Sequence, residues 1–416
     1  MRSMKSYNFL TPVLFAWLLT WASALASAQT FTVLHTFTGP DGGNPEAPVI
    51  LDGAGNIYGT TPAGGDGNCS SEGCGTVFVL NKAGKEIALH SFKGADGFVP
   101  RAGLLRDSKG NLFGTTAQGG RDTRFCGGTQ GGGCGVAFRF NSKGEEAEYK
   151  FEGANGDEPI SPLVEDAAGN LYGTTYYGGD YSWGNVFKVD GTTGKETVLY
   201  SFTGGSDGCL PNGVILDPAG NLYGVAVQGG GGFCSGGEGV LFEIDPAGNE
   251  TVLYTFGGRS GKNPDSVLLF DSQGNLYGTA GYGGSNDSGV VFEVSPQQGG
   301  LWSETVLYSF CSLPQCADGE LPVGGLVRDA EGNLFGTTYF GGSYQNCNGD
   351  ACGVVFKLDP AGNETVLHNF SGGSDGDFPD AGLAMDSAGN LYGTTQAGGA
   401  SCFGQFTCGV VFKITP

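Results

Sequence analysis

One short motif, Gly-Asn-Leu-Tyr-Gly-Thr-Thr, occurs seven times in this chain with small changes. The asparagines of successive copies are 55, 59, 51, 54, 58 and 57 residues apart. A period of this size, repeated seven times, indicates an array of supersecondary units, and it overrides the two or three domains that 416 residues would suggest by length. These asparagines are Asn56, Asn111, Asn170, Asn221, Asn275, Asn333 and Asn390.

Each repeat reads as four short β-strands. The copy that begins at Pro211 contains four runs rich in Val, Leu, Tyr and Phe, separated by Asp, Gly, Asn and Pro, which is typical of strands joined by hairpins. No amphipathic helix of useful length follows residue 28. Four antiparallel strands in ~56 residues predict one propeller blade. The four runs span residues 212–217, 222–227, 239–244 and 250–256.

Two phenylalanine columns and one aspartate column recur in all seven copies. A phenylalanine lies in the third strand and another ends the fourth strand, as blade-on-blade packing requires, because each ring can bury ~150–250 Å². An aspartate stands four residues before each repeat asparagine, where it can accept backbone N–H groups of the turn. These columns are Phe78, Phe138, Phe187, Phe242, Phe292, Phe356 and Phe412; Phe37, Phe92, Phe151, Phe202, Phe256, Phe310 and Phe370; and Asp52, Asp107, Asp166, Asp217, Asp271, Asp329 and Asp386.

The two ends of the repeat array complement each other. Residues 31–37 match the fourth strand of a unit, whereas residues 409–414 match a third strand. The first strand can therefore complete the last sheet, which removes exposed edges. We predict an all-β fold: a single domain over residues 29–416 that is a seven-bladed β-propeller of four-stranded antiparallel blades, with the ring closed by the N-terminal strand.

Residues 1–28 have the pattern of a secretory signal peptide. Arg2 and Lys5 precede an apolar run, and Ala26-Ser27-Ala28 offers a cleavage site before Gln29. No later segment approaches the ~18 apolar residues that a membrane-spanning helix needs. We therefore expect cleavage near Ala28, no transmembrane segment in the mature chain, and a secreted or periplasmic location.

The formal net charge is −22, from 20 basic and 42 acidic residues. Such a field repels phosphate backbones and anionic lipids, so nucleic acid and membrane surfaces are poor partners. It also favours solubility, and we expect a monomer.

Twelve cysteines, an even number in an exported chain, predict six disulfides. None has the spacing of a zinc site, so we expect no metal bound to cysteine. Cys209 lies in a loop between two blades, and Cys234 lies in the following loop between the second and third strands of a blade. Both kinds of loop, which vary among the repeats, are expected on the same face of the propeller, so these two cysteines can plausibly pair. The close pairs are Cys69 with Cys74, Cys126 with Cys134, Cys311 with Cys316, Cys347 with Cys352, and Cys402 with Cys408.

The segments G-N-L-Y-G-T-T, G-V-V-F-K-L and E-T-V-L-Y-S-F recur in this order over the whole chain after Gln29. With them the chain resembles the Gloeo/Verruco-type (GloVer) tandem-repeat proteins, which are exported bacterial proteins. The resemblance implies the repeat architecture and export, and it implies no established activity.

Catalytic side chains are scarce. The three histidines, His35, His90 and His368, occupy a fourth-strand position where other copies have tyrosine, which indicates a packing role rather than a general base. Unique residues that break the repeat, such as Asp157, Glu158 and Asp377, are better candidates for an active site.

Two sets of loop residues are candidate ligand-binding groups. Five between-blade loops carry Asp-Gly with a proline four residues after the aspartate. These carboxylates could face the axial opening and bind Ca²⁺, another cation or a polyhydroxyl ligand. Alternatively, they could simply form turns. The second set is an aromatic loop that could stack on sugar rings or pack under neighbouring loops. The candidates are Asp41, Asp96, Asp207, Asp318 and Asp375, and Tyr176, Tyr177, Tyr181 and Trp183.

From the sequence we expect a non-catalytic exported propeller that binds a glycan or protein ligand on its disulfide-stapled loop face, without a required cofactor. The alternative is a carbohydrate-active hydrolase or lyase with carboxylates at the axial opening. A purely structural envelope component is a third hypothesis.

Overall fold

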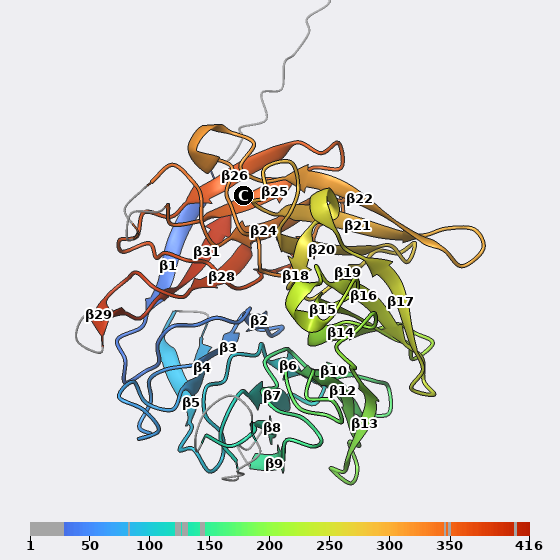
Figure 1. The fold of residues 1–416 in the computed structure, drawn as a ribbon. Helices are drawn as coiled ribbons and strands as arrows, with labels where there is room; N and C mark the ends of the chain where they lie inside the picture. Colours follow the sequence, from blue (N-terminus) through green and yellow to red (C-terminus); the bar gives the residue numbers. More distant parts are fainter. Residues whose placement is uncertain are drawn as a thin grey trace, which may run out of the picture.

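The computed structural model describes residues 29–81, 84–120, 126, 132–141, 146–344, 347, 351–402 and 406–416. The predicted signal peptide, residues 1–28, lies outside them. The described chain forms seven antiparallel sheets of at least four strands, arranged as blades around a common axis (Figure 1). The predicted seven-bladed propeller is confirmed.

Blades 1 to 6 each consist of consecutive strands, with the first strand innermost. Blade 1 contains β2 (Ile50–Leu51), β3 (Ile57–Thr61), β4 (Thr76–Leu80) and β5 (Glu86–Ser91). Blade 2 contains β6 (Leu105–Arg106), β7 (Leu112–Thr116), β8 (Val136–Phe140) and β9 (Glu146–Lys150). Blade 3 contains β10 (Val164–Glu165), β11 (Leu171–Thr175), β12 (Asn185–Val189) and β13 (Glu196–Ser201). Blades 4 to 6 contain β14 (Cys209–Leu216), β15 (Leu222–Gln228), β16 (Val240–Ile244) and β17 (Glu250–Thr255); β18 (Lys262–Pro264), β19 (Leu269–Phe270), β20 (Leu276–Tyr282), β21 (Val290–Pro296) and β22 (Trp302–Ser309); and β23 (Val327–Arg328), β24 (Leu334–Thr338), β25 (Val354–Leu358) and β26 (Glu364–Asn369).

Blade 7 closes the ring with both ends of the described chain. It contains β27 (Ala384–Met385), β28 (Leu391–Thr395), β31 (Val410–Thr415) and β1 (Thr30–Thr36), in the order β1-β31-β28-β27. The N-terminal strand pairs antiparallel with β31, from Thr30 opposite Thr415 to Thr36 opposite Val410. The predicted closure is therefore confirmed. A small ribbon of β29 (Ser401–Cys402) and β30 (Phe406–Thr407), and three short 3₁₀ turns, lie in the loops.

The repeat motif builds a turn and the second strand. In all seven copies the asparagine amide donates to the carboxylate of the aspartate four residues earlier, at 2.6–2.9 Å. In blade 4, for example, the other oxygen of Asp217 accepts the backbone N–H groups of Ala219 and Asn221 at 2.8 Å. These aspartates and asparagines therefore have the turn role that the sequence predicted.

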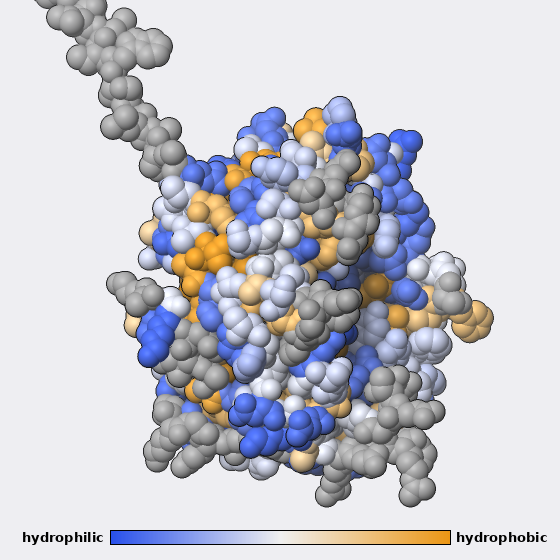
Figure 2. All heavy atoms as spheres, turned by 90° about the vertical axis from the view of Figure 1, so that its left-hand side faces the viewer, coloured by the Kyte–Doolittle hydropathy of each residue, from blue (hydrophilic) through white to orange (hydrophobic). Residues whose placement is uncertain are grey.

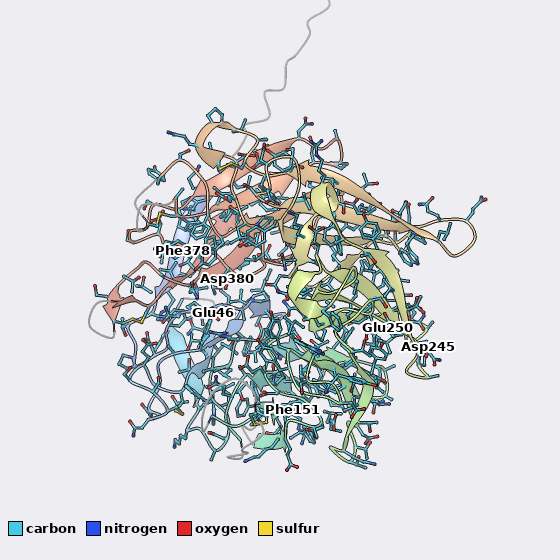
Figure 3. All side chains as sticks on the ribbon, in the orientation of Figure 1. Glu46, Phe151, Asp245, Glu250, Phe378 and Asp380 are labelled. Atoms are coloured by element: carbon cyan, nitrogen blue, oxygen red, sulfur yellow. A yellow bond between two sulfur atoms is a disulfide. The ribbon has the colours of Figure 1, made fainter. Side chains whose placement is uncertain are left out.

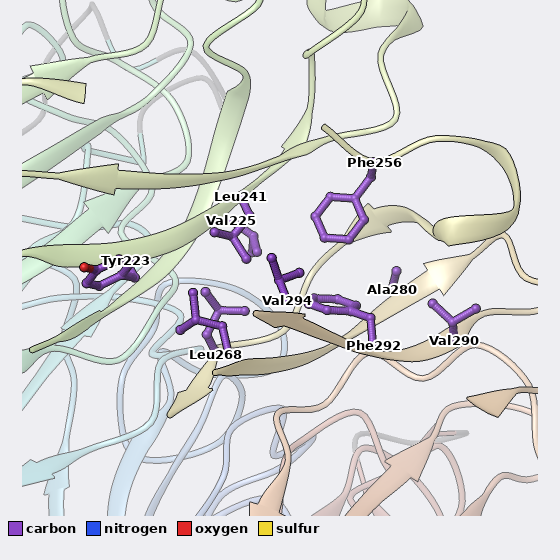
Figure 4. Close-up of a cluster of buried hydrophobic side chains, with 10 residues drawn as sticks. Tyr223, Val225, Leu241, Phe256, Leu268, Ala280, Val290, Phe292 and Val294 are labelled. Atoms are coloured by element: carbon purple, nitrogen blue, oxygen red, sulfur yellow. The ribbon is translucent and has the colours of Figure 1, made fainter. Parts of the chain in front are cut away.

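The two phenylalanine columns pack blade against blade. The ring that ends each fourth strand contacts the third-strand ring of the next blade at a centroid distance of 4.9–5.3 Å, all around the propeller. Figure 4 shows one such contact, Phe256 on Phe292, within the core between blades 4 and 5. The second glycine of the motif makes room for the ring: a Cβ at Gly278 would lie 2.5 Å from Cζ of Phe292.

The outer wall of the ring is mixed in character. On the side that carries β1 and β5, polar residues are interspersed with small apolar areas (Figure 2). Within the described residues, no helix has the length and hydropathy to cross a membrane.

Candidate functional site

The five aspartates of the between-blade loops turn toward the outermost strand. Asp41 accepts hydrogen bonds from the Thr38 backbone N–H at 2.8 Å and from His35 Nε2 at 3.1 Å. Burial alone would raise the pKa of Asp41, but these hydrogen bonds outweigh it and hold the pKa below its usual value. Each of the other four aspartates likewise accepts two kinds of hydrogen bond, one from a backbone N–H of its own turn and one from the His or Tyr side chain of the fourth strand. These four are Asp96, Asp207, Asp318 and Asp375.

The structure therefore does not bring these carboxylates together at the axis. These aspartates fix the turn that follows the fourth strand, and the three histidines are their partners in three of these turns. His90 Nε2, for instance, donates to Asp96 Oδ2 at 3.0 Å, and its ring packs edge-on against Phe92.

All six predicted disulfides are present, and every predicted pairing is confirmed. Five of them close short loops of 5 to 8 residues, whereas the sixth joins cysteines 25 residues apart. The loops that carry these cysteines are thus covalently fixed. The bridges join Cys69 to Cys74, Cys126 to Cys134, Cys209 to Cys234, Cys311 to Cys316, Cys347 to Cys352, and Cys402 to Cys408.

One of these bridges lies beside a carboxylate. Asp157 lies within 4.8 Å of the sulfurs of Cys126 and Cys134. That pair is oxidised, so it offers no thiolate to a metal.

A left-handed residue precedes a proline at the same place in every blade. Seven non-glycine residues have φ between 53° and 58° here, a conformation that costs ~1–3 kcal/mol. Backbone hydrogen bonds hold each of them: Glu158 donates its N–H to the Cys134 carbonyl at 3.3 Å and accepts the Tyr176 N–H at 3.0 Å. The seven are Asn44, Val99, Glu158, Leu210, Asn263, Leu321 and Phe378.

The residue after that proline faces the axis, and here the seven copies differ. We call these seven positions the axial ring. Because first and second strands are antiparallel, the axial ring lies on the same face as the variable loops that carry the cysteines. Its members are Glu46, Arg101, Ile160, Asn212, Asp265, Val323 and Asp380.

All seven members of the axial ring line one cavity of about 610 Å³. Tyr176 and Tyr177, which follow β11, also line it, and their rings meet edge-to-face at 5.0 Å. Glu158 adds a fourth carboxylate. Tyr181 and Trp183, the other two aromatic candidates, lie outside this lining and are exposed at 56% and 38%.

The polar members of the axial ring fall into two groups. Blades 7, 1 and 2 supply Asp380, Glu46 and Arg101, while blades 4 and 5 supply Asn212 and Asp265. Apolar Ile160 in blade 3 and Val323 in blade 6 separate the two groups on either side. The cavity therefore has two polar walls with an apolar residue at each junction.

Most of these polar groups are paired. Arg101 Nε donates to Glu46 Oε2 at 2.9 Å, and Gln396 Nε2 donates to Glu46 Oε1 at 2.9 Å. Asn212 Nδ2 donates to Asp265 Oδ1 at 2.7 Å. Burial raises the pKa of Asp265 to about 6 even though the hydrogen bond from Asn212 opposes the rise.

Asp380 is different, because among the described residues no group donates a hydrogen bond to its carboxylate. Protein surrounds this carboxyl on nearly all sides, while a small solvent-accessible area remains toward the cavity. Burial, followed by the charges of Glu46 and Asp265, raises its pKa to about 7, and Arg101 only partly offsets this. Figure 3 shows Asp380 and Glu46 close together on the inner side of the ring.

A family model described as the Gloeobacter/Verrucomicrobia repeat matches residues 20–129, 120–351 and 315–416. The chain belongs to the Gloeobacter/Verrucomicrobia repeat family. This confirms the family resemblance seen in the sequence. Among curated proteins, none is similar in sequence to this family member.

Two solved structures from B. thetaiotaomicron resemble this Gloeobacter/Verrucomicrobia repeat protein in fold. One is the extracellular domain of a protein described as a hybrid two component system, with 14% identity and a TM-score of 0.56 over 94% of this chain and 41% of that chain. The other, described as a one component system, has 15% identity and a TM-score of 0.56 over 93% of this chain and 42% of that chain. This chain thus spans about two fifths of their length, and at such identities the likeness shows the fold alone.

Sequence reasoning missed most of the axial ring of this repeat protein. It selected Glu158, which lines the cavity, and Asp157 and Asp377, which do not. Asp377 Oδ2 instead lies 3.4 Å from Sγ of Cys347, in the Cys347–Cys352 disulfide. The available signal was the residue directly after each between-blade proline, where the copies show seven occupants of very different chemistry.

Proposed function

We propose that this propeller is a binding protein that holds a saccharide in its axial cavity without transforming it. One observation carries the proposal. Seven copies that agree in their turns and packing diverge at the residue that faces the axis, and all seven occupants line the same cavity.

The lining supports a polyhydroxyl ligand. Ligand sites of a few hundred Å³ usually combine apolar walls with a few placed polar groups, as this cavity does. Carboxylate and amide oxygens of Glu46 and Asn212 can accept hydroxyl hydrogen bonds, and the guanidinium N–H groups of Arg101 other than Nε can donate. Tyr176 and Tyr177 offer aromatic surface at one side.

The disulfides support a role in ligand binding outside the cytoplasm. Six disulfides are typical of a protein that folds in an oxidising compartment. Secretion or export to the periplasm through a cleaved signal peptide at residues 1–28, and recognition on the disulfide-stapled face, belong to this proposal.

Glycan-array screening of the purified protein, followed by calorimetry on the best ligand, tests the proposal. Tyr177→Ala should weaken binding on the order of 10-fold, since stacking contacts contribute ~1–1.5 kcal/mol. Tyr282→Ala is the matched control, because Tyr282, the last residue of β20, has the same repeat position in blade 5 and lies outside the cavity lining. No glycan binding above background, or equal losses in both variants, would overturn the proposal.

Carbohydrate cleavage is the second candidate, and one observation favours it. Asp265 and Asp380 come from different blades, line the same cavity, and have pKa values raised to about 6 and about 7. A protonated acid beside an ionised carboxylate is the arrangement that glycosidases use. Release of reducing ends from a polysaccharide panel, abolished by Asp265→Asn or Asp380→Asn, would establish it in place of simple binding.

A further inference from the structure

Asp380 is the one acidic member of the axial ring whose carboxylate has no hydrogen-bonded or ion-paired partner among the described residues. Glu46 has Arg101 and Gln396 as partners, and Asp265 has Asn212. The Asp380 carboxyl has no hydrogen-bond donor among the described residues, although it is enclosed by protein and faces the cavity. An ionised carboxylate in such a place costs free energy unless a cation or a hydrogen-bond donor pairs with it.

The remaining charges of the cavity do not supply that cation. Glu46, Glu158, Asp265 and Asp380 stand against the single cation Arg101, whose Nε is already bound to Glu46. The whole chain carries a formal charge of −22, so its field also concentrates cations near the protein. A positively charged ligand is therefore favoured over a neutral or anionic one.

The surroundings of Asp380 suit an amino group on a sugar ring. Val323 of blade 6 lies between Asp380 of blade 7 and Asp265 of blade 5 in the order of the ring, so an apolar contact is flanked by two carboxyls. Tyr339, which follows β24, lies close enough to Asp380 that the carboxylate charge helps to raise the pKa of Tyr339, after the effect of burial, to about 12. A primary ammonium has three N–H donors and can bind more than one carboxylate at once.

We propose that the saccharide bound in the axial cavity is an amino sugar whose protonated amino group forms an ion pair with Asp380. The inference rests on the proposed saccharide-binding function and specifies its ligand class. Asp265 and Glu46 then act as the neighbouring hydrogen-bond acceptors, and the ligand supplies a positive charge that pairs with Asp380.

Calorimetry with a glucosamine oligomer and with its fully N-acetylated counterpart of the same length tests the inference at about pH 7 and low salt. The glucosamine oligomer should bind at least ~10-fold more tightly, and added salt should reduce this preference. Asp380→Asn should weaken the glucosamine complex on the order of 10- to 100-fold and change binding of the N-acetylated oligomer by less than ~2-fold.

Asp377→Asn is the matched control. Asp377 lies three residues earlier, is buried, and faces the Cys347–Cys352 disulfide rather than the cavity, so its replacement should leave both affinities unchanged. Thermal melts of each variant establish that the propeller is folded.

The outcomes separate this inference from the proposed function. Equal binding of both oligomers, or an equal effect of Asp380→Asn on both, overturns the amino-sugar inference and leaves saccharide binding intact. If only neutral glycans bind on the array, the amino-sugar inference is likewise overturned and saccharide binding remains. Oligolysine that binds as tightly as the glucosamine oligomer would show that a cationic peptide is recognised instead. Binding of no saccharide at all overturns both proposals.

Discussion

Replacing Glu250 with glutamine should stabilise the propeller at high pH and have almost no effect at low pH. Glu250 begins the outermost strand of blade 4, and its Oε1 atom is buried without a hydrogen-bond partner. Burial and then the charge of Asp207 raise the pKa of this carboxyl to about 7. Glu304 and Glu364, at the same position in blades 5 and 6, also have pKa values near 7 for which burial is the largest cause.

The size of the effect follows from that shift. A rise from 4.5 to about 7 corresponds to at most about 3.4 kcal/mol of differential stabilisation. The Glu250 side chain is partly exposed, so solvent screening reduces this value, and we expect about 1–2 kcal/mol. Glutamine keeps the shape of the side chain and removes the ionisation.

The sign is set by the raised pKa. Below pH 4.5 the carboxyl is protonated in both folded and unfolded chains, and it imposes no penalty on folding. Between pH 4.5 and 7 the unfolded chain ionises first, so the stability of the wild type falls, and above pH 7 the full penalty is present. The gain from Glu250→Gln should therefore appear across this same window.

Urea unfolding, followed by intrinsic fluorescence at about pH 5, 7 and 8.5, measures this gain. Glu196→Gln is the comparison, because Glu196 at the same position in blade 3 accepts hydrogen bonds from Tyr149 Oη at 3.0 Å and Asn155 Nδ2 at 3.3 Å. Burial raises the pKa of Glu196 too, but these hydrogen bonds oppose the rise, so Glu196→Gln should gain less at high pH than Glu250→Gln. A Glu250→Gln gain that does not depend on pH, or an equal gain in Glu196→Gln, would refute the reasoning.

Three further outcomes are expected. Gly278→Ala should lower the free energy of unfolding by about 1–3 kcal/mol, whereas Gly53→Ala, with no atom within 4 Å of the added Cβ, should be nearly neutral in the same urea titration. Replacing Cys209 and Cys234 with serine should cost about 3 kcal/mol, because this bridge has the longest separation of the six, at 25 residues; an unchanged urea midpoint would contradict this. Asp380→Asn should raise the melting temperature near pH 8, where the wild-type carboxylate is ionised, and a fall would mean that the carboxylate has a stabilising partner.

The sequence predicted the ring because the ring depends on positions that repeat. Phe256 and Phe292 belong to columns that recur seven times, and each column needs only its neighbour in the next blade. The hydrogen bonds from Asn221 to Asp217 are local, so turn chemistry alone was enough to predict them. Periodicity also showed that β1 would complete the last sheet.

The cavity could not be predicted in the same way. Glu46, Arg101, Asp265 and Asp380 are far apart in the chain, and they meet only because the ring closes. A search for recurrence favours positions that agree, whereas a binding site formed by the repeats consists of positions that differ. The loop aspartates such as Asp41 attracted attention because they recur, but their hydrogen bonds lie within the turn.

Pairing of β1 with β31 also fixes when the closed axial cavity can exist during synthesis. β1 is the first of the described strands to leave the ribosome and β31 is the last, so blade 7 cannot assemble until nearly all of the described chain has been made. Until then β1 presents an open sheet edge, which is the feature most prone to misassociation. A chain that stalls during synthesis would thus carry most of its blades and no closed axial cavity.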